Sequence, residues 1–445
     1  MLEKISRILQ KYKYADAQIT KTDFTAISIK DGKVESVREG TTENISCRVL
    51  MQNSFGFASS NQVGNGEAVV GEAEKLAKLK GGKIKLAQPE ANKANLGTKI
   101  TDNPKNHSFE EKIRLLLEIE KLAKIKRTSS TLLNYYDACS KTNFLNSSGA
   151  EISEIDIRTG AAANIFAKDG ALLENSYEQV KEKAGFEIMK MFPGKVEKAA
   201  KEANSLLAAR HGPKGKMMAI LDPELAGVFA HEAVGHACEA DAIANGSSCL
   251  GGKMGRKIGS ANVTIKDSPI ISPELWGSYQ FDDEGTRSRG TTLVKNGILN
   301  AYLTSLETAN QYKSTLTGNA RGDSSSRQIV RMSNTYFEKG GCKREELFDE
   351  VKNGIYLVGC KEGQVSPKVG NFTFAAKYGF IIRNGEKKEM VRDCSINGNI
   401  LTALHKIDMV ASDLEFLPGT CGKDGQSAPV TTGAPHLRIR EILVG

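Results

Sequence analysis

The chain has 445 residues, of which 40% are hydrophobic and 26% charged, proportions ordinary for a globular protein of two or three domains. At this length a sizeable hydrophobic core can form without stabilising disulfides. It contains no apolar run of membrane-spanning length, and its net charge of +8 is dispersed along the chain, so neither a membrane nor a nucleic acid is an expected partner.

The first elements expected along the chain are a helix and a hairpin. Apolar residues at helical spacing predict a helix within residues 1–14. Strand-like alternation then surrounds Asp31-Gly32, a dipeptide typical of two-residue hairpin turns. The same signal recurs at three further places, Asp169-Gly170, Asn296-Gly297 and Asn384-Gly385. Antiparallel sheet is therefore expected to dominate the fold.

Helices are expected at residues 67–80, 109–126 and 196–209. Ser108, followed three residues later by Glu111, predicts a capping box at the start of the second helix. The segment between the first two helices is rich in Lys, Asn, Gly and Pro, which predicts an irregular connection. After the third helix, Gly-Pro-Lys-Gly precedes an apolar strand, and this change in composition indicates a domain boundary.

These signals predict an α+β fold with mostly antiparallel sheets. We expect an N-terminal α/β domain at residues 1–212, with a further division near residues 81–107, and a β-rich C-terminal domain at residues 213–445. The eight cysteines include no CxxC pair, which argues against a disulfide framework. The N-terminus lacks the apolar block of a signal peptide, so a reduced, cytoplasmic setting is expected.

One helix of the second domain concentrates polar side chains of catalytic type. Asp222, Pro223 and Glu224 predict its start, through a capping side chain, a ring that presets the backbone and a carboxylate at the positive end of the helix dipole. The helix is expected to continue into the run HEAVGHACEAD at residues 231–241.

The inward face of this helix carries two carboxylates. At about 100° per residue, Glu232, His236 and Glu239 fall on the apolar stripe. An unpaired buried carboxylate costs several kcal/mol, so these side chains require partners. A metal ion or its bound water would serve, and so would mutual hydrogen bonds in a cleft wall. A regular helix would favour an ExxxHxxE site for a harder metal such as iron or manganese.

The two histidines of the run can share an ion only if the helix is distorted. His231 and His236 are five residues apart, which places them about 140° apart around a regular helix. The HExxH arrangement of many metallopeptidases uses a spacing of four residues. A π-type bulge would add the extra residue, and Gly235 would make that distortion easier.

Five segments together are distinctive: ADAQITKTDFTAISIKDGKVESV at residues 15–37, HEAVGH at 231–236, DDEG at 282–285, RMSNTY at 331–336 and LPGTCGKDGQ at 417–426. With them the chain resembles the TldD/PmbA peptidase family, specifically the TldD-type subunit that retains the metal motif. The resemblance extends over nearly the whole chain. The combination of HEAVGH with the cysteine segment is its most specific part.

The resemblance implies a metal centre. His231, His236 and Cys421 would bind one divalent ion, zinc or another divalent metal, and Glu232 would act as general base. Zinc accepts nitrogen and sulfur ligands, and a catalytic site keeps one position open for water. Cys238, seven residues from His231, is a competing ligand that the family pattern does not favour. Proline and glycines around Cys421 predict that it lies in a tight loop.

The function implied is hydrolysis of short or unfolded peptides by metal-activated water. The alternative is a non-catalytic metal-binding or scaffold subunit of a heteromeric peptidase complex. Either way, the family implies a dimer with a PmbA-type subunit or with a second copy. The roles of Asp283 and Glu284, in a turn before the hairpin at Asn296-Gly297, stay open between structure, metal and substrate. Arg321 and Arg331 could bind a peptide carboxylate.

Overall fold

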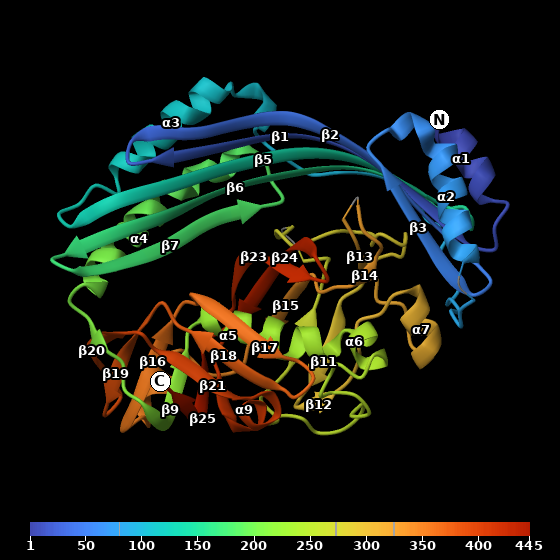
Figure 1. Ribbon diagram of the computed structural model, residues 1–445. Helices are drawn as coiled ribbons and strands as arrows, with labels where there is room; N and C mark the ends of the chain where they lie inside the picture. The colour runs from blue at the N-terminus through green and yellow to red at the C-terminus, as the bar shows by residue number, and fades with distance from the viewer. Residues whose placement is uncertain (80, 272–273, 324) are drawn as a thin grey trace.

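The computed structural model describes residues 1–79, 81–271, 274–323 and 325–445. The fold is α+β and most strands pair antiparallel, as the sequence predicts. In Figure 1 a long, curved sheet formed by the first half of the chain arches over the second half, which forms a more compact body of shorter strands and helices.

In the part of the first half that the structure describes, the arched sheet contains seven strands. Their order is β3-β2-β1-β5-β6-β4, with β7 paired to β6, and β4 alone runs parallel to its neighbour. Turns at Asp31-Gly32 and Gly170-Ala171 join β1 to β2 and β6 to β7, which confirms two predicted hairpins, the second with its turn one residue later than predicted. The strands are β1 Ala15–Lys30, β2 Lys33–Met51, β3 Ser54–Ser60, β4 Lys93–Gly97, β5 Thr128–Asn146, β6 Glu151–Asp169 and β7 Leu172–Glu182.

Four helices pack on this sheet: α1 Leu2–Leu9, α2 Gly66–Lys78, α3 Phe109–Lys121 and α4 Phe192–Leu206. The predicted helices therefore exist, with ends shifted by a few residues; Lys80, the predicted end of α2, lies outside the described residues. Ser108 and Glu111 form the predicted capping box at α3. The predicted irregular connection between α2 and α3 is largely irregular, but it contributes β4 and the short 3₁₀ helix η2, Pro104–Asn106.

The alternation of side chains along β1 divides its contacts between the two sides of the sheet. Ala15, Ala17 and Ile19 are buried in a core shared with α1 and α2. Successive side chains of a strand point to opposite faces, so Asp16 and Gln18 point away from these helices. There Gln18 contacts Asp283 directly, and Asp16 binds Arg48, which in turn binds Glu284.

Within its described residues, the second half contains three sheets, one of them a pair of two-residue strands. The six-stranded one has the order β12-β11-β10-β15-β24-β23, and the ten-stranded one β17-β18-β21-β25-β9-β16-β19-β20-β8 with β22 on β25. Hairpins at Asn296-Gly297 and Asn384-Gly385 join β11 to β12 and β19 to β20, as predicted. The strands are β8 Arg210–His211, β9 Gly215–Leu221, β10 Ile265–Asp267, β11 Thr291–Lys295, β12 Ile298–Leu299, β13 Ala320–Arg321, β14 Ile329–Val330, β15 Asn334–Phe337, β16 Asn353–Val358, β17 Glu362–Ser366, β18 Asn371–Ala375, β19 Tyr378–Arg383, β20 Glu386–Arg392, β21 Ser395–Asn399, β22 Ile407–Val410, β23 Glu415–Lys423, β24 Gln426–Ala434 and β25 Leu437–Val444.

A buried helix, α5 Pro223–Phe229, lies between the two larger sheets. The Phe229 ring contacts Phe337 of β15 on one side and Phe374 of β18 on the other, at centroid distances of 6.1 and 6.0 Å. Shorter helices surround it: α6 Ala240–Ala244, α7 Leu306–Tyr312, α8 Glu346–Asp349 and α9 Ile400–Lys406. Strand β8 already belongs to the ten-stranded sheet, and the domain division at residue 212 stays a prediction.

Candidate metal centre

The helix that carries the two histidines begins where the sequence predicts. Asp222 caps it by accepting a hydrogen bond from the Leu225 N–H at 2.9 Å, and Pro223 occupies the first turn. After Phe229 the backbone changes to a π-helix, η4 Ala230–Gly235, followed by a 3₁₀ turn, η5 His236–Cys238. The predicted π-type distortion of this helix is confirmed.

The distortion brings the two imidazoles together. The ring centroids of His231 and His236 lie 5.2 Å apart with an interplanar angle of 84°. A regular helix would separate residues at this spacing by about 140°, whereas a wider π turn returns them to one side. An ExxxHxxE site depends on a regular helix, so this geometry removes its basis.

Gly235 has a different role from the one expected. Its backbone is helical, with φ −55° and ψ −59°, so no unusual conformation requires glycine. A Cβ atom at this position would lie 1.9 Å from the Sδ atom of the buried Met332. Glycine is therefore needed for the close approach of Met332 to the helix.

Cys421 lies on strand β23, and the prediction of a tight loop was wrong. It pairs with Ala428 of β24, and the turn of this hairpin is Asp424-Gly425, both with positive φ. Proline and glycine are tolerated here because β23 is an edge strand. On its open side, the backbone N–H that proline lacks is not needed for a hydrogen bond to another strand.

The β23–β24 hairpin places the thiol of Cys421 next to the two histidines. The Sγ atom of Cys421 lies 3.4 Å from Nε2 of His236. One potential ligand atom from each of His231, His236 and Cys421 lies within 4.8 Å of the others, and we call these three residues the donor triad. The Nδ1 atom of His231 is buried and has no hydrogen-bond partner among the described residues. Two nitrogens and a sulfur are a donor set that fits zinc.

Electrostatics favour a thiolate in the donor triad. Burial opposes ionisation of Cys421, but hydrogen bonds and positive charge from His231 and His236 lower the pKa of its thiol to about 5. Burial likewise opposes the charged form of His236, but Glu239 and Cys421 raise its pKa well above the ordinary value. The thiolate is the form that binds metals. Cys238, the competing candidate, is fully buried and lies outside the triad, and burial raises its pKa.

Two carboxylates adjoin the triad in different ways. Glu232 is partly exposed, and its Oε2 atom lies 3.8 Å from Nε2 of His236. Glu239 is buried, and its Oε2 atom lies 3.0 Å from Nδ1 of His236 and 3.1 Å from Nζ of Lys423. Lys423 was missed in the sequence, although its spacing of two residues from Cys421 on a strand places both side chains on one face.

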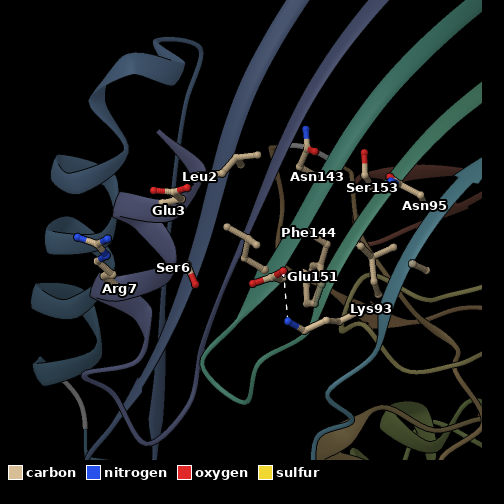
Figure 2. Close-up of a pocket in the computed structure, with 13 residues that line it drawn as sticks. Leu2, Glu3, Ser6, Arg7, Lys93, Asn95, Asn143, Phe144, Glu151 and Ser153 are labelled. Atoms are coloured by element: carbon tan, nitrogen blue, oxygen red, sulfur yellow. Dashed lines mark ion pairs between the residues drawn. The ribbon is translucent and has the colours of Figure 1, made fainter.

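A groove runs between two sheet edges, those of β7 and β23. Among the described residues, β7 pairs only with β6 and β23 only with β24. A cavity lies between these strands and is also lined by Val228, Cys360 and Lys377. Gln179 of β7 donates a hydrogen bond across it to the carbonyl of Pro418 at 2.8 Å. A second cavity lies between α1 and the β4 edge (Figure 2), and the residues that line these two cavities include none of the triad.

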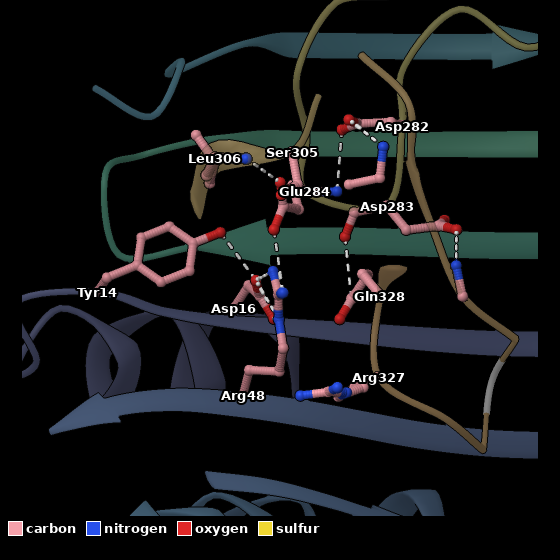
Figure 3. Close-up of polar contacts among 12 residues, drawn as sticks. Tyr14, Asp16, Arg48, Asp282, Asp283, Glu284, Ser305, Leu306, Arg327 and Gln328 are labelled. Carbon is pink, nitrogen blue, oxygen red and sulfur yellow. Dashed lines mark hydrogen bonds and ion pairs between the residues drawn. The ribbon is translucent and has the colours of Figure 1, made fainter. Parts of the chain in front are cut away.

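The DDEG turn joins the two halves of the chain (Figure 3). Asp282 shapes the turn by accepting hydrogen bonds from the N–H groups of Glu284, Thr286 and Ala320. Asp283 accepts one from Gln18 at 3.0 Å, and Glu284 binds Arg48 at 3.0 Å. Within the described residues, these carboxylates are occupied by protein partners.

Both arginines singled out in the sequence hold backbone carbonyls. Arg331 is 1% exposed and donates a hydrogen bond to the carbonyl of Cys421 at 2.5 Å. Arg321 donates to the carbonyls of Met332 and Pro429 at 3.0 and 2.8 Å, and stacks on Tyr279. They therefore brace the β23–β24 hairpin, which the sequence did not reveal.

Comparison with known proteins decides the family. Three family models match the chain: PmbA/TldA metallopeptidase domain 1 at residues 15–79, the central domain at 102–207 and the C-terminal domain at 214–445. The chain belongs to the TldD/PmbA metallopeptidase family. A protein of Methanocaldococcus jannaschii that is named a metalloprotease is 38% identical over 98% of each chain.

One further relative and one solved structure are also similar to this chain. A protein of Saccharolobus solfataricus named zinc metalloprotease TldD homolog is 28% identical, over 97% of this chain and 96% of its own. The crystal structure of TldE from Thermococcus kodakarensis shares the fold with a TM-score of 0.82 at 19% identity, covering 100% of this chain and 99% of that one. A metal cofactor is therefore supported for this TldD/PmbA member. No helix in the described part of the chain is long and apolar enough to cross a membrane.

Proposed function

We propose that this protein is a zinc-dependent peptidase in which His231, His236 and Cys421 hold one ion and Glu232 is the general base. The observation that carries the proposal is the convergence of three donor atoms within 4.8 Å, from two segments far apart in the sequence. The family and the name of the Saccharolobus relative support both the activity and the choice of zinc.

The residues around the triad have the chemistry that peptide hydrolysis requires. A bound zinc ion lowers the pKa of water and polarises a carbonyl. Glu232, partly exposed beside His236, would accept a proton from the attacking water and return it to the leaving amine. Substrates would be short or unfolded peptides, because the groove lies between sheet edges where an extended chain finds unpaired backbone groups.

Metal content and peptidase activity, measured on the same samples, test the proposal. Purified protein should contain one zinc per chain, and exhaustive chelation should abolish hydrolysis of a mixture of short peptides. Cys421→Ser should lose the stoichiometric metal, whereas Cys360→Ser, which changes a thiol in the neighbouring groove, should keep it. Glu232→Gln should keep the metal but lose about 10²–10⁴-fold in rate. Activity that survives both chelation and Glu232→Gln would exclude the mechanism.

The alternative is a non-catalytic subunit of a heteromeric peptidase complex. The shared fold with TldE is the observation in its favour. Stoichiometric zinc without hydrolysis by the isolated protein, followed by hydrolysis once a co-purified related subunit is added, would support it. Size measurement of the purified protein would separate a dimer of identical copies from a monomer awaiting a partner.

A further inference from the structure

We infer that Glu239 and Lys423 form one positioning unit that joins the helix-borne and strand-borne halves of the donor triad. The inference rests on the proposed function, because it concerns how the triad is held. A single carboxylate oxygen, Oε2 of Glu239, contacts Nδ1 of His236 at 3.0 Å and Nζ of Lys423 at 3.1 Å. It thereby links a residue of the histidine helix to a residue of the cysteine hairpin.

Lys423 anchors the hairpin that carries the thiol. It lies two residues after Cys421 on β23, so both side chains point to the same face of the strand. Its ammonium group also contacts both carboxylate oxygens of Asp241 at 2.9 Å and donates a hydrogen bond to the carbonyl of Val330 at 2.9 Å. These contacts surround a single ammonium group and set the position of the end of β23.

Glu239 is held rigidly enough to orient an imidazole. Its side chain is 1% exposed. Its backbone, at the junction of η5 and α6, forms a parallel β-bridge with Leu303. Because a carboxylate can only accept, His236 must donate its Nδ1–H to it. Nε2 of His236 is then left facing Cys421. Ligand histidines commonly have such a partner, which fixes both the tautomer and the ring orientation.

Charge balance explains why the lysine accompanies the glutamate. Glu239 and Asp241 are two carboxylates within reach of the same ammonium group. A buried carboxylate without a partner is strongly unfavourable, so Lys423 makes it possible to place Glu239 behind the imidazole. The contacts thus form a closed chain. The His236 ring binds the Glu239 carboxylate, which binds the Lys423 ammonium group. Strand β23 connects Lys423 to Cys421, whose thiol faces His236 again.

Two isosteric substitutions test the inference through zinc affinity, measured by competition with a chelating dye. Glu239→Gln removes the charge behind His236, and zinc affinity should fall by about 10–100-fold. Asp408→Asn removes the charge of a carboxylate that binds Arg438 and Arg440 and, among the described residues, no member of the triad, and the affinity should stay close to that of the wild type. Unchanged affinity in Glu239→Gln, or equal losses in both variants, would overturn the inference.

A second measurement uses the metal-free protein. Amide hydrogen exchange in β23 and β24 should be faster in Glu239→Gln than in the wild type, because the hairpin loses its link to the helix. Unaltered exchange would overturn the inference whatever the metal result. If Glu239→Gln does not fold, Glu239→Asp keeps the charge but shortens the reach to His236, and it too should weaken zinc binding. A wild-type protein without any zinc affinity would instead refute the proposed function, while the exchange experiment would still decide the inference.

Discussion

Arg48 of β2 donates a hydrogen bond to Glu284 of the DDEG turn at 3.0 Å, and this buried ion pair joins the arched sheet to the second half of the chain. The same guanidinium binds Asp16 of the adjacent strand β1. Glu284 in turn accepts a hydrogen bond from the N–H of Leu306 at the start of α7. The four residues therefore connect the first strands of the chain to the body that contains the donor triad (Figure 3).

Removal of this buried arginine should be strongly destabilising. Arg48→Met would leave Asp16 and Glu284 buried without their cation, at an expected cost of about 3–5 kcal/mol in the free energy of unfolding. The control is Lys21→Met, which breaks the exposed Lys21–Glu43 pair and should have little effect. Denaturant unfolding measures both, and similar stabilities of the two variants would refute the importance of the Arg48 contacts.

A methyl group at Gly235 should be poorly tolerated. Gly235→Ala would place its Cβ against Met332, and overpacking of this kind typically costs about 1–3 kcal/mol. Gly71→Ala is the matched control, because Gly71 lies in helix α2 and a Cβ there meets no atom within 4 Å. The control should be neutral or gain about 0.4–1 kcal/mol. Thermal unfolding distinguishes the two, and a stabilised Gly235→Ala protein would contradict the close approach of Met332.

The Cys421 thiol of the metal-free protein should ionise at unusually low pH. Its pKa is about 5 against an ordinary value of 9.0, because His231 and His236 favour the thiolate despite burial. The depressed pKa stabilises the folded state. This stabilisation is fully present above pH 9.0, the ordinary pKa, and is lost as the pH falls through about 5. Ultraviolet absorbance of the thiolate should show this transition in the wild type, and the transition should be absent in Cys421→Ser. A transition near the ordinary value would contradict the geometry.

The capping carboxyl of the histidine helix should have the opposite pH dependence. Burial and the neighbouring Glu224 raise the pKa of Asp222 to about 7 from an ordinary value of 3.8. The folded state then binds more protons than the unfolded state between these values, so stability falls as the pH rises through this window. Asp222→Asn keeps a capping oxygen but does not ionise. Its free energy of unfolding relative to the wild type should therefore be more favourable at high pH than at low pH.

Asp408 provides the contrast for this experiment. Burial opposes its charge, but Arg438 and Arg440 lower its pKa below the ordinary value. Asp408→Asn should therefore cost stability at neutral pH, and that cost should disappear as the pH falls through the depressed pKa. For each variant, the difference from the wild type in the free energy of unfolding should be measured across pH. This difference should rise with pH for Asp222→Asn and fall with pH for Asp408→Asn, and parallel slopes would refute the two pKa assignments.

Local signals in the sequence were sufficient for most elements. The four Asp-Gly and Asn-Gly hairpins, the capping box at Ser108 and the start of α5 at Asp222 depend on neighbouring residues alone, and all of them are present. The hairpin at Asp424-Gly425 has the same dipeptide signal, and it could have placed Cys421 on a strand. The proline and glycines around it favour a loop instead, and this composition outweighs the dipeptide when the sequence is considered alone.

By itself, the sequence indicated the family, the candidate donor residues and the need for a distorted helix, because the spacing of His231 and His236 and the geometry of a helix are local properties. Only the tertiary structure decided what surrounds those donors: Met332 against Gly235, Glu239 and Lys423 behind His236, and Arg331 on the Cys421 carbonyl. These contacts join residues up to 184 positions apart, as the Glu239–Lys423 pair does. Their formation depends on how whole sheets pack, a property that local sequence patterns do not encode.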